Sequence, residues 1–230
     1  MKTALQAATT SIIGFAAFLL MVFWPAGTFD YWQGWAFIAV FAAATTIPSI
    51  YLAATNPAAL KRRMQAGPAA ETRLLQKIII AFAFLSMAAM IVVSALDFRF
   101  GWSSVPAAVS VVGDVLVAVG LLITMITTIQ NGYAAANIKV EPDQKVVTTG
   151  VYSLVRHPMY FGNVVLMVGV PLALGSYWGL LFVIPGLVVL AIRILDEEKA
   201  LTIELTGYRD YVQRVHYRLV PYVWRWRTEI

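Results

Sequence analysis

Two charged side chains, Arg193 and Glu197, lie four residues apart near the end of a long apolar segment. In a helix this spacing places both on one face. A guanidinium can hold an anionic group through two parallel hydrogen bonds, and a carboxylate can accept hydrogen bonds from hydroxyls or an ammonium group. The pair therefore predicts a binding or catalytic site. The alternative interpretation is a structural pair in which Arg193 reaches toward the membrane interface.

A second polar cluster, Arg156-His157-Pro158 with Tyr160 behind it, precedes another apolar segment. Pro158 cannot continue a helix through His157, but it suits the first turn of a new helix. We therefore predict a helix that starts at Pro158 with His157 as its cap. Its first turn offers unpaired N–H groups and a partial positive charge, which suit the carboxylate end of a ligand. Taken alone, the cluster also fits a basic anchor, and Tyr152 and Tyr160 also fit interfacial aromatics.

The elements that must position these clusters are membrane helices. The chain has 230 residues, of which 60% are hydrophobic and 13% charged, which is too apolar for a soluble globule. A helix needs ~20 residues to cross the hydrocarbon of a bilayer. Apolar runs of that length occur at 4–24, 33–55, 75–96 and 105–130, and two shorter runs at 161–175 and 177–195 form a helical hairpin. We predict an all-α, polytopic integral-membrane bundle of about five to six helices.

The basic residues indicate the orientation of this bundle. If the N-terminus is cytoplasmic, the inside segments and inside helix ends hold sixteen of the seventeen lysines and arginines, and only Arg99 lies outside. The positive-inside rule therefore predicts that both termini and both polar clusters are cytoplasmic. Basic loops on anionic lipid explain the net charge of +5, so we predict membrane lipids and no nucleic acid as partners.

The polar clusters divide the chain into two halves of one integrated membrane domain. Residues 1–130 are expected to be a four-helix scaffold, and residues 131–230 the functional half with a cytoplasmic loop, the hairpin and an amphipathic tail. The linker 56–74 is expected to contain a short interfacial helix. The tail from Glu198 to Trp226 repeats apolar residues at helical spacing and is broken at Gly207, so it predicts a short helix that could cover a ligand.

The composition argues against several kinds of site. The chain has no cysteine and only His157 and His216 as histidines, so we predict no metal site. It lacks a G-x-G-x-x-G fingerprint, a Walker loop and a G-x-S-x-G elbow. Asp114, inside the fourth apolar run, is expected to be structural.

The ordered set of motifs from about residue 130 to 222 resembles the isoprenylcysteine carboxyl methyltransferase and phospholipid methyltransferase superfamily. The set comprises Val147-Thr-x-Gly-x-Tyr152, the run from Arg156 to Gly162, the hairpin, Arg193 with Glu197-Glu198, and Gly207-x-x-x-Tyr211 leading to Arg218-Leu-Val-Pro221. The resemblance implies an integral-membrane enzyme that uses S-adenosylmethionine without a Rossmann fold.

The resemblance also implies residue roles. Arg193 would face a lipophilic or lipidated acceptor, and Glu197 would contact the cofactor, which makes these two the catalytic candidates. This chain departs from many prenylcysteine enzymes of the superfamily, which have histidine at the position of Gln144. The remaining cofactor contacts would come from side chains at the helix start, the main chain of 144–147 and one asparagine, namely Tyr152, His157, Pro158, Tyr160, Gln144, Lys145, Val146, Val147 and Asn137.

The chemistry of methyl transfer fits these residue types. It is an in-line displacement, so positioning can supply much of the acceleration. A carboxylate or thiolate acceptor needs no general base, whereas an amine does. The absence of a dedicated base other than Glu197, Glu198 and His157 favours an acceptor that is already anionic.

Two other functions remain open from the sequence. Membrane sterol and steroid reductases resemble this half of the chain but use NADPH. Their pattern usually has Asn and Glu where this chain has Met159 and Asn163, which favours the methyltransferase. A non-catalytic transporter or assembly protein is the third possibility, although no internal repeat indicates a transporter.

Overall fold

The described residues of this computed structural model form a helical bundle. The structure describes the backbone of residues 2–64, 73–134 and 144–225, and side chains from Gly14 onward within these ranges. No strand occurs in these ranges, and a lone bridge joins Tyr217 to Arg225. The elements in chain order are α1 (Lys2–Ala26), α2 (Trp32–Thr55), α3 (Pro57–Met64), α4 (Leu74–Phe100), α5 (Ala107–Gln130), η2 (Gly150–Ser153), α6 (Pro158–Ala173), η3 (Trp178–Phe182), α7 (Val183–Glu204) and α8 (Tyr208–Arg214).

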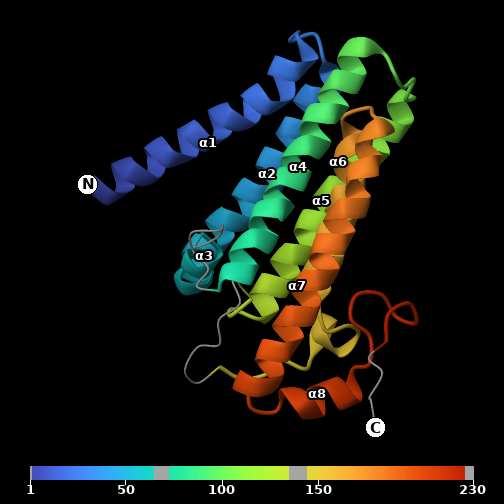
Figure 1. The fold of residues 1–230 in the computed structure, drawn as a ribbon. Helices are drawn as coiled ribbons and strands as arrows, with labels where there is room; N and C mark the ends of the chain where they lie inside the picture. Colours follow the sequence, from blue (N-terminus) through green and yellow to red (C-terminus); the bar gives the residue numbers. More distant parts are fainter. Residues whose placement is uncertain (1, 65–72, 135–143, 226–230) are drawn as a thin grey trace.

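The predicted all-α membrane bundle is confirmed. Four helical stretches are long and apolar enough to cross a membrane: α2, α4, α5 and the continuous stretch Trp178–Glu204 that contains α7. The described part of α1 from Gly14 to Ala26 and the helix α6 are shorter and also apolar. The long helices run side by side, while α1 leans away from the bundle toward its N-terminal end (Figure 1). The short helix expected in the linker 56–74 is α3.

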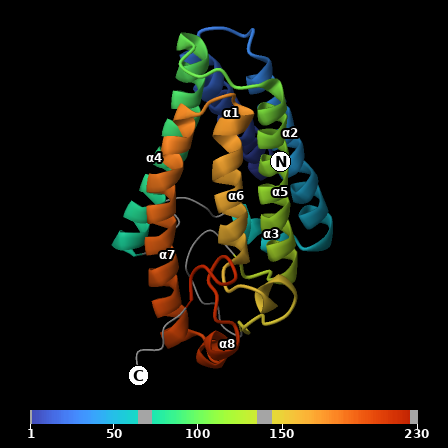
Figure 2. The same cartoon turned by 90° about the vertical axis from the view of Figure 1, so that its right-hand side faces the viewer.

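Helix α6 is too short to cross the bilayer alone. Its sixteen residues correspond to a length of about 24 Å. It therefore starts well above the lower end of its hairpin partner α7, as the two views show (Figures 1 and 2). The segment 144–157 and the helix α8 lie below that start. The shortness of α6 thus places a polar cavity at the end of the bundle instead of continuous helix packing.

Glycines let α5 approach α6 closely. A Cβ atom on Gly120 would lie 2.7 Å from the carbonyl oxygen of Gly162, and one on Gly162 would lie 2.7 Å from the carbonyl oxygen of Gly120. A Cβ on Gly169 would lie 2.8 Å from the amide nitrogen of Val117. Small residues at such crossings allow backbones to pack tightly in lipid, where the hydrophobic effect does not drive helix association. This contact fixes the height and rotation of α6, and with them its first turn.

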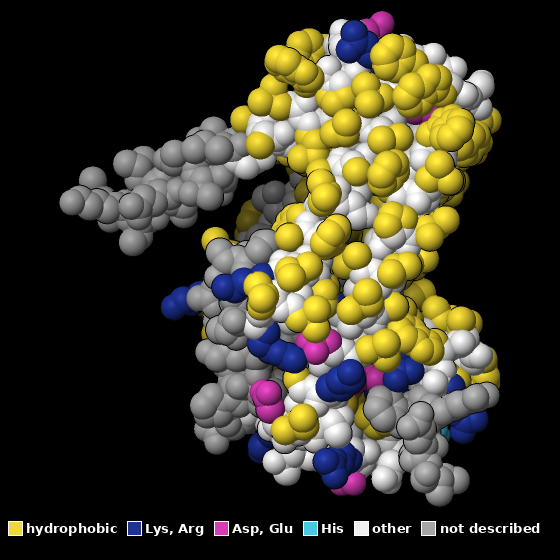
Figure 3. All heavy atoms as spheres, in the orientation of Figure 1, with side chains coloured by type: hydrophobic (Ala, Val, Ile, Leu, Met, Phe, Trp, Pro, Cys, Tyr) yellow, Lys and Arg dark blue, Asp and Glu magenta, His cyan; other side chains and the backbone are white. Residues whose placement is uncertain are grey.

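Basic side chains gather at one end of the molecule. Dark blue side chains are concentrated at the lower end in Figure 3, where α3 and α8 lie, and the middle of this face is largely hydrophobic. Arg63 of α3 and Arg209 of α8 belong to this end. Arg99 lies in the last turn of α4 at the opposite end. Asp114 is 8% exposed in α5, and its Oδ1 has no hydrogen-bond partner in the described part of the chain.

Candidate active site

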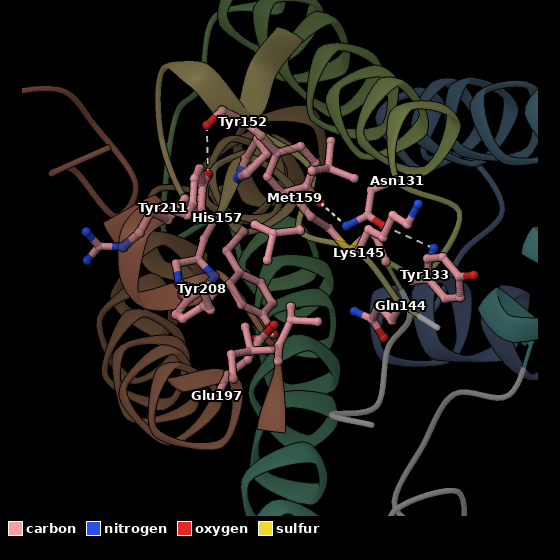
Figure 4. Close-up of a pocket in the computed structure, with 18 residues that line it drawn as sticks. Asn131, Tyr133, Gln144, Lys145, Tyr152, His157, Met159, Glu197, Tyr208 and Tyr211 are labelled. Atoms are coloured by element: carbon pink, nitrogen blue, oxygen red, sulfur yellow. Dashed lines mark hydrogen bonds between the residues drawn. The ribbon is translucent and has the colours of Figure 1, made fainter. Parts of the chain in front are cut away.

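A cavity opens beneath the start of α6, at the basic end of the bundle. Its walls are the first turn of α6, the end of α7, the turn after α5, the segment 144–147 and the helix α8. Figure 4 shows side chains from these elements pointing toward a common space. Nine of the predicted cofactor-binding residues line it: Gln144, Lys145, Val146, Val147, Tyr152, His157, Pro158, Tyr160 and Glu197. The tenth, Asn137, lies outside the described residues.

The helix start is where the sequence places it, but His157 does not cap it with its side chain. Helix α6 begins at Pro158 with His157 at the N-cap position, and the side chain makes no capping hydrogen bond. Instead, His157 Nε2 lies 3.2 Å from Glu198 Oε1. The imidazole is therefore turned toward α7, and its ring stacks on Tyr160 with a centroid distance of 5.5 Å.

Glu198 is the centre of a buried ionic cluster. Its Oε1 accepts a hydrogen bond of 2.8 Å from Arg156 Nε, and its Oε2 accepts one of 2.9 Å from Arg218 Nε. The side chain of Glu198 is 1% exposed, and that of Arg156 is fully buried. Such burial of charge is tolerated only when the ions are paired and hydrogen-bonded. The cluster joins α7, the segment before α6 and the C-terminal tail into one unit behind the cavity.

The C-terminal tail is held against the start of α6 by its main chain. The amide of Arg156 donates to the carbonyl of Tyr217, and the amide of His157 donates to the carbonyl of Arg218, both at 2.9 Å. The guanidinium of Arg218 also lies over the ring of Trp224, 4.9 Å from its centroid. The tail therefore fixes the backbone that carries His157, one of the predicted site residues.

Tyr160 links the two charged residues Arg193 and Glu197. Its hydroxyl donates a hydrogen bond of 2.5 Å to Glu197 Oε2 and accepts one of 2.9 Å from Arg193 Nε. The one-face arrangement of Arg193 and Glu197 is therefore organised around a tyrosine from α6. Glu197 lines the polar cavity, whereas Arg193 lines a second cavity beside it.

This second cavity is apolar and lies between α4, α6 and α7. Its wall consists of Ala83, Phe84, Ser86, Met87, Met90, Asn163, Leu166, Met167, Gly186, Val189, Leu190 and Arg193. The guanidinium of Arg193 is the charged group among these side chains. The two linings are connected by the hydrogen bond between Arg193 and Tyr160, since Tyr160 and Glu197 line one cavity and Arg193 lines the other.

Tyr152, which also lines the cavity, is held by two hydrogen bonds. Its hydroxyl accepts a hydrogen bond of 3.1 Å from Asn131 Nδ2, and its carbonyl accepts one of 2.7 Å from the hydroxyl of Tyr211 (Figure 4). Burial raises the pKa of Tyr152 to about 12, and the charge of Glu197 adds to this effect. Burial also raises the pKa of Tyr208 and Tyr211. These phenols stay neutral near pH 7.

Helix α8 covers one side of the cavity, in line with the prediction of a helical tail broken at Gly207. That glycine has φ +84° between α7 and α8, a conformation that glycine adopts without steric cost. Leu205, Tyr208 and Tyr211 form a small buried cluster against which Val146 and Tyr152 pack. The cover therefore packs directly on the predicted cofactor residues.

Several residues of the site carry no clear signal in the sequence. Asn131 follows an apolar helix and reads as a turn residue, yet it holds Tyr152 and accepts a hydrogen bond from the amide of Tyr133. Gln76 of α4 is fully buried and contacts Arg193 from a half of the chain that shows no motif. Glu198 is visible as the neighbour of Glu197, but its partners lie 20 to 42 residues away.

Comparison with known families fits this geometry. Residues 108–208, from α5 to the start of α8, match the family model described as phospholipid methyltransferase. The match covers this segment of the chain, and the family is part of the isoprenylcysteine and phospholipid methyltransferase superfamily. No curated protein matches the chain. The resemblance seen in the sequence is therefore confirmed at the level of the superfamily, and the four long apolar helices support an integral-membrane protein.

Proposed function

We propose that this protein is a membrane methyltransferase that binds S-adenosylmethionine in the polar cavity and a lipophilic acceptor in the apolar cavity. The observation that carries the proposal is that Tyr160 bonds to Glu197, which lines the polar cavity, and to Arg193, which lines the apolar one. A group-transfer enzyme needs a polar and an apolar reactant to approach each other, and the two cavities lie on either side of these hydrogen bonds.

The residues of the polar cavity suit the chemical groups of the cofactor. Glu197 can accept hydrogen bonds from an ammonium group or ribose hydroxyls. The aromatic faces of Tyr160 and Tyr208 suit a sulfonium cation or a flat base, and both residues line the cavity. When bound, the cofactor supplies an activated methyl group. The segment 144–147 would offer main-chain groups, and Asn137 remains a proposed contact outside the described residues.

Each proposed role of the chain is positional or electrostatic. The Glu198 cluster holds His157 and the backbone before α6, and Tyr160 holds Arg193 and Glu197 in a fixed relation. Helix α8 excludes water from one side of the cavity, which strengthens electrostatic interactions inside it. In-line displacement gains rate from such preorganisation without requiring a metal or a covalent intermediate.

The acceptor side favours an amphiphile of isoprenylcysteine type. Eight of its twelve wall residues are Ala, Phe, Met, Leu or Val, so they suit an apolar chain, while Arg193 and the amide of Asn163 suit a polar end. A carboxylate would be held by Arg193 and needs no general base. Thiol and amine acceptors are the alternatives within this proposal. Measuring methyl transfer to each class of acceptor distinguishes them.

The two cavities also support the proposed division of the chain. The lining of the polar cavity comes from residues 131–211, within the proposed cofactor-binding and catalytic half 131–230. Residues 1–130 would serve as the scaffold, although α4 and its side chains form one wall of the acceptor cavity. We place both termini and the polar cavity at the cytoplasmic face, because the basic side chains gather there.

The decisive experiment is calorimetric binding of S-adenosylmethionine, S-adenosylhomocysteine and NADPH to the purified protein in detergent. We expect the first two to bind and NADPH not to bind. E197A and H157A should weaken binding by at least about tenfold, since each removes a charged or ring contact at the cavity. R193A should leave cofactor binding within about twofold, because the Arg193 side chain lines the other cavity and Glu197 still holds Tyr160.

Methyl transfer from labelled cofactor is then measured with prenylated cysteine, long-chain thiols and phospholipid amines. R193A should lower transfer to the preferred acceptor while cofactor binding persists. E204A is the matched control for E197A, because Glu204 is an exposed carboxylate at the end of the same helix. Binding of NADPH in place of the sulfonium cofactor would move the protein to the reductases, and binding of none of them by folded protein would contradict the proposal.

A further inference from the structure

Arg193 is held from α4 by a neutral side chain that lies outside the matched family segment. Gln76 is fully buried, and its Oε1 accepts a hydrogen bond of 2.7 Å from Arg193 Nη1. The residue lies 117 positions before Arg193 and before the segment 108–208 that matches the family model. The first turn of α4 thus contributes directly to the acceptor side of the candidate active site.

The orientation of the Gln76 amide is fixed by Asp196. Gln76 Nε2 donates a hydrogen bond to Asp196 Oδ2, so its oxygen must face Arg193. Asp196 in turn pairs with Arg73 at 3.0 Å, with side-chain exposures of 12% and 44%. In this network, the neutral amide of Gln76 lies between the carboxylate of Asp196 and the guanidinium of Arg193. A carboxylate at position 76 would instead bring a full negative charge against Arg193.

We propose that Gln76 is a positioning residue that aims Arg193 at the apolar cavity and, because it is neutral, lets Arg193 favour acceptors with an anionic end. This inference rests on the proposed function in taking the apolar cavity between α4, α6 and α7 as the acceptor site. Gln76 itself lines neither cavity. It acts through the hydrogen bond that holds Arg193, while Tyr160 holds the guanidinium from the α6 side.

A double substitution that leaves the net charge unchanged can distinguish this positioning role from a purely structural one. In Q76E/D196N, the carboxylate at position 76 accepts from Arg193 and from the new amide at position 196. The hydrogen bonds are kept, and only the one between positions 76 and 196 reverses its direction. The net charge of the protein does not change. The negative charge, however, moves from the Arg73 side of the network to the Arg193 side.

The test measures binding of an apolar anion and needs neither the cofactor nor turnover. A stearate with a doxyl spin label near its carboxyl group is compared with its neutral methyl ester on the full-length protein in lipid nanodiscs. The immobilised spectral component reports the bound fraction of each probe. We expect the wild type to prefer the anion, and R193Q to lose that preference. Q76E/D196N should lower it about fivefold, as charge-assisted hydrogen bonds exceed neutral ones by that order.

Two further variants keep the test specific. K77Q alters an exposed basic residue next to Gln76 and should leave the preference unchanged, which controls for general attraction of anions to the basic end. Q76L should lower both the preference and the unfolding temperature, whereas Q76E/D196N should keep the unfolding temperature near that of the wild type. The proposal is overturned if the wild type does not discriminate between the probes or if Q76E/D196N retains the wild-type preference.

Because this readout does not involve S-adenosylmethionine, its failure is distinct from failure of the methyltransferase proposal. A protein that binds the cofactor but shows no anion preference would keep the proposed function and lose the role of Gln76. A protein that prefers the anion but binds no cofactor would keep the role of Gln76 and lose the methyl-transfer assignment.

Discussion

Glu198 has more described ionic partners than any other carboxylate in the candidate active site. Arg156, His157 and Arg218 all face it, and the cluster is almost completely shielded from solvent. Its neighbour Glu197 lines the cavity and bonds to Tyr160. The two adjacent glutamates therefore have different contacts, because successive residues of a helix point about 100° apart. One supports the backbone around the site, and the other is placed to contact a ligand.

This difference predicts opposite effects of two similar substitutions. E198A should destabilise the protein by about 3–5 kcal/mol, because it leaves two guanidiniums buried without their shared carboxylate. E197A should change stability by no more than about 1 kcal/mol while it weakens cofactor binding. Chemical denaturation in detergent measures both.

The exposed Glu204, two turns beyond on α7, provides the control for loss of a helix carboxylate. E204A should be nearly neutral in the same denaturation experiment. If E198A proves as stable as E204A, the ionic cluster is not what holds the tail and the start of α6 together.

At the scale of elements, the contact between α5 and α6 determines where the site lies. Helix α6 carries Tyr160 in its first turn and Gly162 just behind it, so the residue that bonds to both Arg193 and Glu197 is adjacent to this close helix crossing. In a bilayer, such close packing replaces the hydrophobic driving force that is absent between helices. A change in the crossing would therefore shift Tyr160 relative to α7.

This predicts that G162V impairs both the fold and the site. Added methyl groups at this crossing should destabilise the protein by about 1–3 kcal/mol through overpacking, and cofactor binding should weaken because Tyr160 is displaced. The thermal unfolding midpoint and calorimetric binding report the two effects.

Gly14 of α1 supplies the matched control, because a Cβ atom there would meet nothing within 4 Å. G14V should leave the unfolding midpoint and the binding constant close to those of the wild type. Equal effects of the two substitutions would mean that the valine side chain, and not the crossing, is responsible.

At the scale of the whole molecule, charge is distributed so that one end suits the cytoplasm. Arg63 of α3 and Arg209 of α8 lie at the end that contains the polar cavity, and Arg99 lies at the other end. By the positive-inside rule we propose that the polar cavity faces the cytoplasm, the compartment that would supply a water-soluble cofactor. The apolar cavity lies between helices within the bundle, where an acceptor from the membrane would be expected.

The absence of cysteine from the chain makes this orientation easy to test. T28C and R209C each introduce one thiol at an exposed position, at opposite ends of the bundle. In sealed cells, a membrane-impermeant maleimide should label T28C, and it should label R209C only after the membrane is opened. The reverse labelling pattern would invert the proposed topology.

Much of the fold follows from local sequence pattern. The length of each apolar run fixes which segments can span a bilayer, Pro158 fixes the start of α6, and Gly207 separates α7 from α8. Each of these features depends on residues close together in the chain, as do hydropathy, proline geometry and positive φ angles. For the same reason, the run of motifs around His157 and Glu197 is sufficient to indicate the superfamily.

The partners of the side chains were decided only by the tertiary structure. No local rule predicts that His157 turns away from its own helix end to Glu198, that Tyr160 stands between Arg193 and Glu197, or that Gln76 reaches Arg193 across the bundle. Such contacts depend on the relative rotation and height of helices. These are set by close packing, as at Gly120 and Gly162, and not by periodicity. The sequence thus identifies which residues have chemical potential, while the packing determines which cavity each one serves.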